Sequence, residues 1–335
     1  VIHGEKAGDL AGYSVAASRN CERVAFGSIW SDGMGEGSGS AKVFKFVDGE
    51  WVRVGEVIDG DRGEDYLGWS MALSEDGNRL AVGAHGNDDN GLNSGQVRVL
   101  EYIPSSGAWE RLGQNILGEM PGDSSGWSVS LSGNGERVII GAQYNDPEGL
   151  FSGHARVFEF NANSNTWVKL GDDIDGESSN DYSGASVSIS YDGNRIAIGS
   201  AGNGDNGASS GCVRVYKYNT DSSSWNRMGN PILGESSGDE SGFSVSLSSN
   251  GACVAIGARY NDGDGGVDSG HVRVHCYNGS LWSQIGGDID GESAHGWSGN
   301  SVSLSEDGNR VAIGARYNNG NGYKSGHVRV YNLAV

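Results

Sequence analysis

Short segments in which polar and apolar residues alternate recur along the whole chain. The stretch Ser128–Ser132 reads Ser-Val-Ser-Leu-Ser, and this two-residue period is that of a β-strand with one buried face. An Asn-Gly or Asp-Gly pair follows such stretches, as at Asn134-Gly135 and Asp307-Gly308. These pairs are typical of type I′ hairpin turns, in which both central residues have positive φ. No segment combines a helical period with capping residues, so the pattern predicts an all-β protein.

A Gly-aromatic-Ser signature begins the first strand of each of six repeats, although two copies lack the aromatic residue. The six glycines lie 56 to 58 residues apart, and a series of tryptophans follows the same spacing. Four strands in each of six repeats predict a six-bladed β-propeller of four-stranded antiparallel blades. The glycines are Gly12, Gly68, Gly126, Gly184, Gly242 and Gly299, and the tryptophans are Trp51, Trp109, Trp167, Trp225 and Trp282.

The repeat boundaries predict a single propeller over residues 1–335. The repeats fall at about 1–57, 58–115, 116–173, 174–231, 232–288 and 289–335. The sequence ends after the third strand of the sixth repeat, so we expect either that the last blade lacks its outer strand or that the natural chain is longer. An open outer edge can pair with another chain, which predicts a homo- or hetero-oligomer formed there.

The composition is acidic and excludes two classes of partner. Asp and Glu number 43 against 23 Lys and Arg, which gives a formal charge of −20. This charge argues against binding nucleic acid or an anionic membrane surface. Apolar residues make up 36% of the chain, enough to fill a core, yet no apolar run approaches the ~20 residues of a membrane span.

The repeat also resembles a known family. The patterns Ser-Gly-aromatic-Ser-Val, Val-Ala-Ile-Gly-Ala and Ser-Gly-His-Val-Arg-Val are similar to the FG-GAP-type propeller repeat of integrin α-chain heads and of many secreted bacterial and marine proteins. The resemblance implies a β-propeller that acts outside the cell as a non-catalytic recognition module. The family's Gly-Ala-Pro is replaced by Gly-Ala followed by His85, Gln143 or Arg259. A tight Asp-Gly turn replaces the integrin calcium loop, so the integrin calcium site is not carried over.

Acidic loops gather on one predicted face of the propeller. Loops that follow the second and fourth strands of a blade lie on the same face, and here both kinds are rich in Asp, Asn and Glu. Oxygen ligands of this type suit hard cations, and Ca²⁺ is the natural candidate. The alternative is that Asp, Asn and Gly simply form the tight turns. The candidate metal ligands are Asp88, Asp89, Asp146, Asp205, Asp262 and Asp264.

Aromatic residues approach the same face from two repeat positions. Rings beside Asp and Asn suit a sugar or a planar ligand. The alternative is packing between blades, which recurrence in most repeats favours. The candidates at the start of the first strand are Tyr13, Trp69, Trp127 and Phe243, and those after the second strand are Trp30, Tyr144, Tyr260 and Tyr317.

Other recurring residues indicate structural roles. Arginines inside the third strand recur in nearly every repeat, so we expect them to pair with carboxylates or backbone carbonyls: Arg98, Arg156, Arg214, Arg273 and Arg329. Antiparallel pairing of the second and third strands brings Cys253 opposite Cys276, a candidate disulfide. Cys21 and Cys212 have no obvious mates within their own repeats. His154, His271 and His327 share one repeat position, whereas His3, His85, His275 and His295 do not recur.

The sequence is compatible with three functions. No enzyme signature is present, which favours a non-catalytic, secreted recognition module for a protein, glycan or small-molecule ligand. The sequon at Asn278 is compatible with secretion. A second hypothesis is a carrier of a glycan or pigment held by the aromatic residues. A third is a hydrolase with a carboxylate or metal site at the mouth of the central channel.

Overall fold

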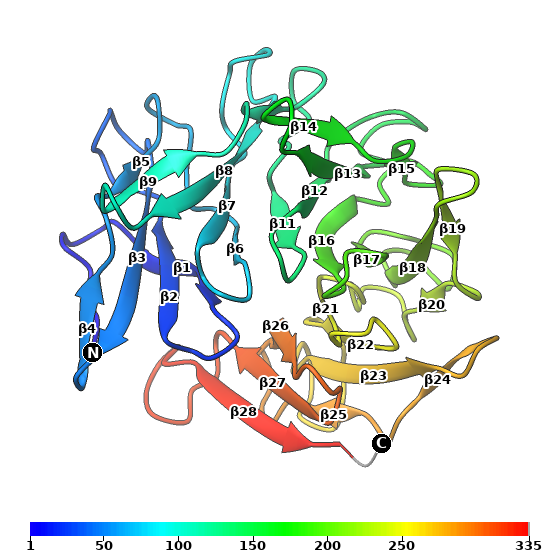
Figure 1. Ribbon diagram of the computed structural model, residues 1–335. Helices are drawn as coiled ribbons and strands as arrows, with labels where there is room; N and C mark the ends of the chain where they lie inside the picture. Colours follow the sequence, from blue (N-terminus) through cyan, green and yellow to red (C-terminus); the bar gives the residue numbers. More distant parts are fainter. Residues whose placement is uncertain (334–335) are drawn as a thin grey trace. The chain divides into compact units, whose positions relative to one another are not determined.

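The computed structural model describes residues 1–333, and the fold is a six-bladed β-propeller built entirely from β-strands (Figure 1). By contact density the chain divides into two compact units. Unit 1 is Val1–Asn145 with Arg156–Leu170, and unit 2 is Asp146–Ala155 with the chain from Gly171 onward. Within residues 1–333 there is no helix long and apolar enough to cross a membrane.

Each of the first five blades is an antiparallel sheet with strands in chain order. The first strands are β1 (Ala11–Ala17), β6 (Met71–Leu73), β11 (Ser128–Leu131), β16 (Ser183–Ile189), β21 (Ser244–Leu247) and β26 (Ser298–Leu304). The second strands are β2 (Arg23–Ser28), β7 (Arg79–Ala84), β12 (Arg137–Ala142), β17 (Arg195–Ser200), β22 (Cys253–Ala258) and β27 (Arg310–Ala315). The third strands are β3 (Ser40–Val47), β8 (Gln96–Ile103), β13 (His154–Asn161), β18 (Cys212–Asn219), β23 (His271–Tyr277) and β28 (His327–Asn332).

The outer edge of each blade is shared between two short strands. One pairs with the carboxyl half of the third strand, and the second pairs with its amino end, so these sheets have five strands. The sixth blade has three strands, β26, β27 and β28, as the sequence predicts. The outer strands are β4 (Glu50–Arg53), β9 (Ala108–Arg111), β14 (Thr166–Lys169), β19 (Ser224–Arg227) and β24 (Trp282–Gln284), and the short fifth strands are β5 (Ile58–Asp59), β10 (Ile116–Leu117), β15 (Ile174–Asp175), β20 (Ile232–Leu233) and β25 (Ile289–Asp290).

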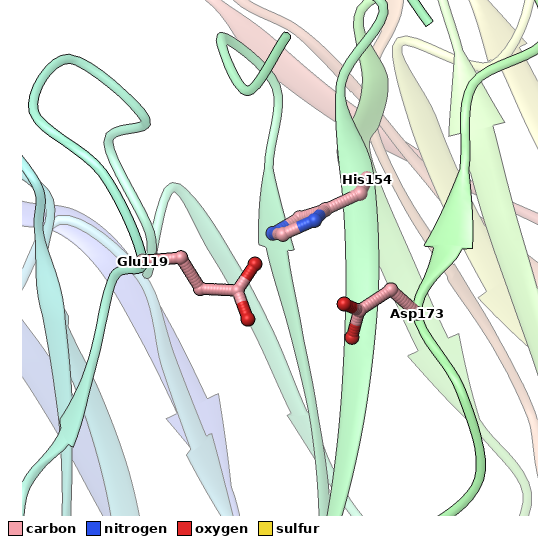
Figure 2. A group of neighbouring side chains, drawn as sticks. All are labelled: Glu119, His154 and Asp173. Carbon is pink, nitrogen blue, oxygen red and sulfur yellow. The ribbon is translucent and has the colours of Figure 1, made fainter. Parts of the chain in front are cut away.

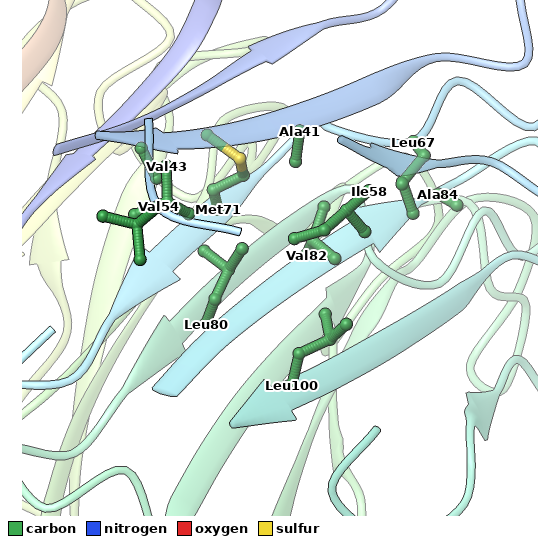
Figure 3. Packing of buried hydrophobic residues seen from close by; sticks show 11 residues of the cluster. Ala41, Val43, Val54, Ile58, Leu67, Met71, Leu80, Val82, Ala84 and Leu100 are labelled. Carbon is green, nitrogen blue, oxygen red and sulfur yellow. The ribbon is translucent and has the colours of Figure 1, made fainter. Parts of the chain in front are cut away.

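The hydrophobic core lies between neighbouring sheets. In unit 1, Val43 of β3 packs in one cluster with Leu80 and Val82 of β7 and with Leu100 of β8 (Figure 3). These side chains are almost fully buried. Burial of apolar area at roughly 25 cal/mol per Å² makes this packing the main attraction between blades.

The Gly-aromatic-Ser signature marks a close contact between the innermost strands of adjacent blades. Ser70 Oγ donates a hydrogen bond of 2.7 Å to the carbonyl oxygen of Gly126 in the next blade. A Cβ at Gly83 would lie 2.2 Å from that same oxygen, so only glycine fits there. The contact repeats in unit 2, where Ser186 Oγ donates to the carbonyl of Gly242 at 2.8 Å.

The type I′ assignment of the hairpin turns is wrong. Only the glycine has positive φ, for example 67° at Gly77, whereas Asp76 does not. The Gly77 N–H donates to the carbonyl of Ser74 at 2.9 Å, which is a type I turn followed by a left-handed glycine. Asp76 Oδ1 accepts hydrogen bonds from the Ser74 hydroxyl and the Asn78 N–H, and these bonds hold the aspartate in its ordinary backbone conformation.

Candidate functional site

Seven rings of unit 1 form a continuous set of contacts, which we call the first aromatic group. The centroids of Tyr13 and Trp69 lie 4.7 Å apart, and Trp127 follows Trp69 at 4.7 Å. Trp127 contacts Tyr144 edge-on at 5.6 Å. Tyr13 is 38% exposed, so the set reaches the surface. The members are Tyr13, Trp30, Tyr66, Trp69, His85, Trp127 and Tyr144.

His85 connects the rings of the first aromatic group. Its centroid lies 4.2 Å from Trp69, 5.1 Å from Trp127 and 5.3 Å from Tyr66. Burial lowers the pKa of His85 to about 4, so the imidazole is neutral at pH 7. Within residues 1–333 its Nε2 has no hydrogen-bond partner. The ring therefore places an unpaired polar atom among the aromatic rings, shielded from solvent.

Unit 2 contains a second aromatic group organised around a cation. The guanidinium of Arg259 lies 3.5 Å from the centroid of Phe243 and 4.5 Å from that of Tyr260. Glu240 holds this guanidinium through contacts of 2.8 and 2.9 Å, and burial raises the pKa of Glu240. Trp297 touches Tyr260 at 5.0 Å and continues the group to Tyr317. Because Arg259 already covers these ring faces, this group is better suited to internal stabilisation than to an incoming ligand.

The loop aspartates named as candidate metal ligands mainly make bonds within their own loops. Asp88 Oδ1 accepts the Asn93 N–H at 2.7 Å, and Asp262 Oδ1 accepts the Asp268 N–H at 2.8 Å. Asp146 makes the same bond with the N–H of Phe151, while Asp89 and Asp205 lie near Arg62 and Arg214 and Asp264 lies near Asp290. Within residues 1–333, no group of three side chains close enough to hold one ion includes any of these six aspartates.

The recurrent arginines of the third strands pair with the carboxylates of the inter-blade loops, which confirms their predicted structural role. Arg214, for example, is 2% exposed and contacts Glu177 at 2.8 Å. Arg273 also donates to the backbone carbonyl of Leu233 at 2.7 Å. The pairs are Arg98 with Asp61, Arg156 with Glu119, Arg214 with Glu177, Arg273 with Glu235 and Arg329 with Glu292.

The recurrent histidines lie beside these same carboxylates. In unit 2, Glu235, His271 and Asp288 each place one potential metal-ligand atom within 4.8 Å of the others. His154 and Asp173 occupy the equivalent repeat positions in the third blade, and Figure 2 draws their side chains. The sequence identified the shared histidine position but not the aspartate that accompanies it.

The cysteines divide into one bonded pair and two free thiols. Cys253 and Cys276, the pair expected from strand register, are joined by a disulfide with Cα atoms 4.1 Å apart. Cys21 is free and exposed, whereas Cys212 is free and buried. Burial raises the pKa of Cys212 to about 12, which leaves this thiol protonated and unreactive at neutral pH.

A recess of unit 2 contains none of the aromatic candidates. It is lined by turn residues, among them Asn250, Asp307 and Arg310. Asp307 already accepts hydrogen bonds from Ser305 and Asn309. The recess therefore consists mostly of hairpin-turn residues, and the carboxylate of Asp307 in it is already hydrogen-bonded.

Sequence reasoning placed five members of the first aromatic group but missed Tyr66 and His85 as members. In the second group it missed Glu240, Arg259 and Trp297. Tyr66, Glu240 and Trp297 share one repeat position two residues before the signature glycine, and His85 and Arg259 share another directly after the second strand. Both positions change residue type from blade to blade, and this variation is the signal that could have identified them.

Comparisons with known proteins identify the repeat and the fold. A model of the FG-GAP repeat matches residues 51–100 and 119–158. No curated protein sequence matches the chain. A proposed 6-phosphogluconolactonase from Bacteroides uniformis has a similar structure, with a TM-score of 0.64 at 11% identity over 96% of this chain and 80% of that one.

Two further solved structures are similar to this chain in fold. One is a proposed 6-phosphogluconolactonase from Bacteroides fragilis, with a TM-score of 0.58 at 11% identity over 95% of this chain and 79% of that one. The other is a periplasmic gluconolactonase from Pseudomonas aeruginosa, with a TM-score of 0.55 at 12% identity over 95% and 88%. At these identities the similarity shows the fold alone. The chain is therefore a six-bladed β-propeller in which residues 51–100 and 119–158 match the FG-GAP repeat.

Proposed function

We propose that this protein is a non-catalytic recognition module that binds a glycan across the first aromatic group. The observation that carries the proposal is the unbroken series of ring contacts between Tyr13 and Tyr144, with Tyr13 and Trp30 38% and 44% exposed. Rings of this kind stack against the apolar faces of sugars.

The charge of the molecule limits the kind of glycan. The chain carries a formal charge of −20, and Glu36 and Glu64 act on the Tyr66 hydroxyl, whose pKa is raised first by burial and then by these two carboxylates. An anionic sugar would be repelled by this field. We therefore expect neutral or amino sugars, whose hydroxyl and ammonium groups donate hydrogen bonds to carboxylates.

An extracellular location is part of the proposal, and two features of the chain support it. FG-GAP repeats occur in the chain, and the Cys253–Cys276 disulfide is of the kind that persists in oxidising compartments. Both features are compatible with a secreted protein that meets glycans outside the cell.

The experiment is a glycan array followed by calorimetric titration of the strongest hit. Tyr13→Ala and Trp30→Ala remove the most exposed rings at small cost to the fold. Each should weaken binding on the order of tenfold, because a stacked ring contributes about 0.5–1.5 kcal/mol beyond its buried area. Phe46→Ala is the matched control, since Phe46 is 46% exposed on β3 and packs against Trp51 rather than the first aromatic group.

Two results would contradict this proposal. One is full binding by both Tyr13→Ala and Trp30→Ala at unchanged affinity. The other is the absence of any glycan hit combined with a visible absorption band of the purified protein, which would favour a pigment carrier.

Lactone hydrolysis is a second candidate function, favoured by the names of the three solved propellers of similar structure. The hypothesis predicts that the protein accelerates the opening of glucono-lactones above the spontaneous rate. Proton release at constant pH measures the reaction, with heat-denatured protein as the control. An unaccelerated rate, both with added divalent metal and with a chelator, would exclude this activity for these substrates.

A further inference from the structure

The His–carboxylate group of the fifth blade combines one imidazole with two carboxylates. His271 opens β23 and pairs in register with Asp290 of β25, and Asp288 stands directly before β25. Glu235 belongs to the loop that follows β20. Three separate segments of unit 2 thus bring one imidazole and two carboxylates together, with ligand atoms within 4.8 Å of one another.

The imidazole of His271 is buried beside a carboxylate. The residue is 1% exposed, and within residues 1–333 the one polar contact of its ring is Nδ1 to Glu235 Oε2 at 3.8 Å, beyond hydrogen-bond distance. A buried polar group normally has a partner, because removing it from water unpaired costs free energy. A cation between the three side chains would be coordinated by this imidazole and by both carboxylates.

Both carboxylates are held by outer contacts that leave a second oxygen available. Arg273 Nη1 contacts Glu235 Oε1 at 3.2 Å, whereas Oε2 is the oxygen nearer His271. Gln284 Nε2 donates to Asp288 Oδ1 at 2.8 Å. Outer contacts of this type orient the ligands of metal sites.

The local charge also favours a cation. Asp264 and Asp290 add two carboxylates to those of Glu235 and Asp288, and Asp290 feels Asp264 and Asp288 as repelling charges. Arg273 and Arg329 are the cations that face the group, through Glu235 and through the carbonyl of Asp290 respectively. Four carboxylates against two guanidinium groups leave a net negative site.

The other blades show that histidine and aspartate occur here together. At the two repeat positions of His271 and Asp288, the third blade has His154 and Asp173. The second blade has Gln96 and Asn115, whose amides bond directly at 2.7 Å. The first and fourth blades have neither a histidine nor an aspartate at these positions. The neutral pair makes one amide–amide hydrogen bond, whereas the His–Asp combination supplies two typical metal ligands.

We propose that Glu235, His271 and Asp288 bind a divalent transition-metal ion such as Mn²⁺ or Zn²⁺. One imidazole nitrogen and two carboxylate oxygens suit such ions better than Ca²⁺, which takes oxygen ligands. Glu235 and Asp288 are exposed, so the ion can enter from solvent and keep water or a substrate oxygen as a further ligand. The site is separate from the first aromatic group and does not depend on the proposed glycan binding.

The double variant His271→Gln/Asp288→Asn tests the site without loss of the fold, because it gives the fifth blade the Gln–Asn pair of the second. Mn²⁺ alone is the probe, and the loss of its free six-line EPR signal counts bound ions. We expect the double variant to bind one Mn²⁺ fewer per chain than the wild type. Asp205→Asn, which neutralises one loop carboxylate elsewhere, should leave the count unchanged.

A second measurement separates ligation from general attraction of cations. Thermal unfolding with millimolar Mn²⁺ should raise the midpoint of the wild type and of Asp205→Asn more than that of the double variant. The proposal is overturned if the double variant binds as many ions as the wild type with the same affinity, or if the wild type binds none. Circular dichroism of the double variant verifies that it is folded.

Discussion

Replacing Trp167 by Phe tests whether the repeating tryptophans stabilise the contact between neighbouring blades. Trp167 lies on β14 and is 3% exposed. Its indole Nε1 donates a hydrogen bond of 2.8 Å to the carbonyl of Leu112, which follows the outer strand of the preceding blade. The indole edge lies 3.0 Å from where a Cβ of Gly113 would stand, so the ring sits directly against that backbone.

The cost of Trp167→Phe has two parts. Phenylalanine cannot donate to the Leu112 carbonyl, and a buried acceptor left without its partner costs about 1–3 kcal/mol. The smaller ring also leaves a cavity of roughly 40 Å³, which at about 24 cal/mol per Å³ adds about 1 kcal/mol. We therefore expect the free energy of unfolding to fall by about 2–4 kcal/mol, the sum of these two contributions.

Trp51→Phe is the matched control in the first blade. Trp51 holds the same repeat position and packs against Phe46 at 5.1 Å, as Trp167 packs against Phe160 at 5.3 Å. Within residues 1–333, however, the Trp51 indole makes no hydrogen bond to a carbonyl. Urea unfolding followed by far-UV circular dichroism should show a loss below about 1 kcal/mol, because most of the Trp51 ring remains in place as Phe. Equal losses for the two variants would refute the view that the indole bond joins the blades.

Three further predictions concern other contacts. Cys253→Ser/Cys276→Ser should lose about 3 kcal/mol of stability, since the bond closes a loop over a sequence separation of 23, and a reducing agent should then have no further effect on the urea midpoint. Burial lowers the pKa of His85 from 6.5 to about 4. The free energy of unfolding therefore contains the full contribution of neutral His85 above pH 6.5, and it falls by up to about 3 kcal/mol as the pH drops to 4. His85→Gln should flatten that part of the stability–pH curve, and an unchanged slope would contradict the assignment. Ser70→Ala removes the donor to the Gly126 carbonyl and should cost about 1 kcal/mol in the same urea assay.

The fold could be predicted from the sequence because each blade repeats the residues that its contacts require. The signature serine and glycine recur because Ser70 Oγ and the Gly126 carbonyl form a bond between adjacent inner strands. Trp167 recurs because a backbone carbonyl of the preceding blade accepts its indole N–H. A contact that several blades make leaves a period in the sequence, and the period is visible without coordinates.

The turns and the site could not be predicted to the same degree. The type I′ assignment failed because it considered backbone preference alone, whereas the Asp76 carboxylate accepts bonds from Ser74 and Asn78 that favour another turn. The acidic loops predict calcium from their composition, and in the structure one carboxylate oxygen of Asp88 and one of Asp262 accept backbone N–H groups of their own loops. Composition does not reveal side-chain hydrogen bonds of this kind.

The position of Tyr66 supports a role for its side chain beyond the architecture of the blade. Every blade adopts a left-handed backbone there, with φ of 55° at Tyr66 and 56° at Trp297. A side chain in this region costs free energy that glycine avoids, and glycine does occur two residues earlier, at Gly122 and Gly238 with φ of 90°. Yet all six repeats carry a side chain at this position: Leu10, Tyr66, Ser124, Tyr182, Glu240 and Trp297. The six blades keep a side chain here at a cost in backbone free energy, and they use five different residue types. Such a side chain contributes contacts that vary between blades, as expected where a repeated scaffold presents one particular binding surface.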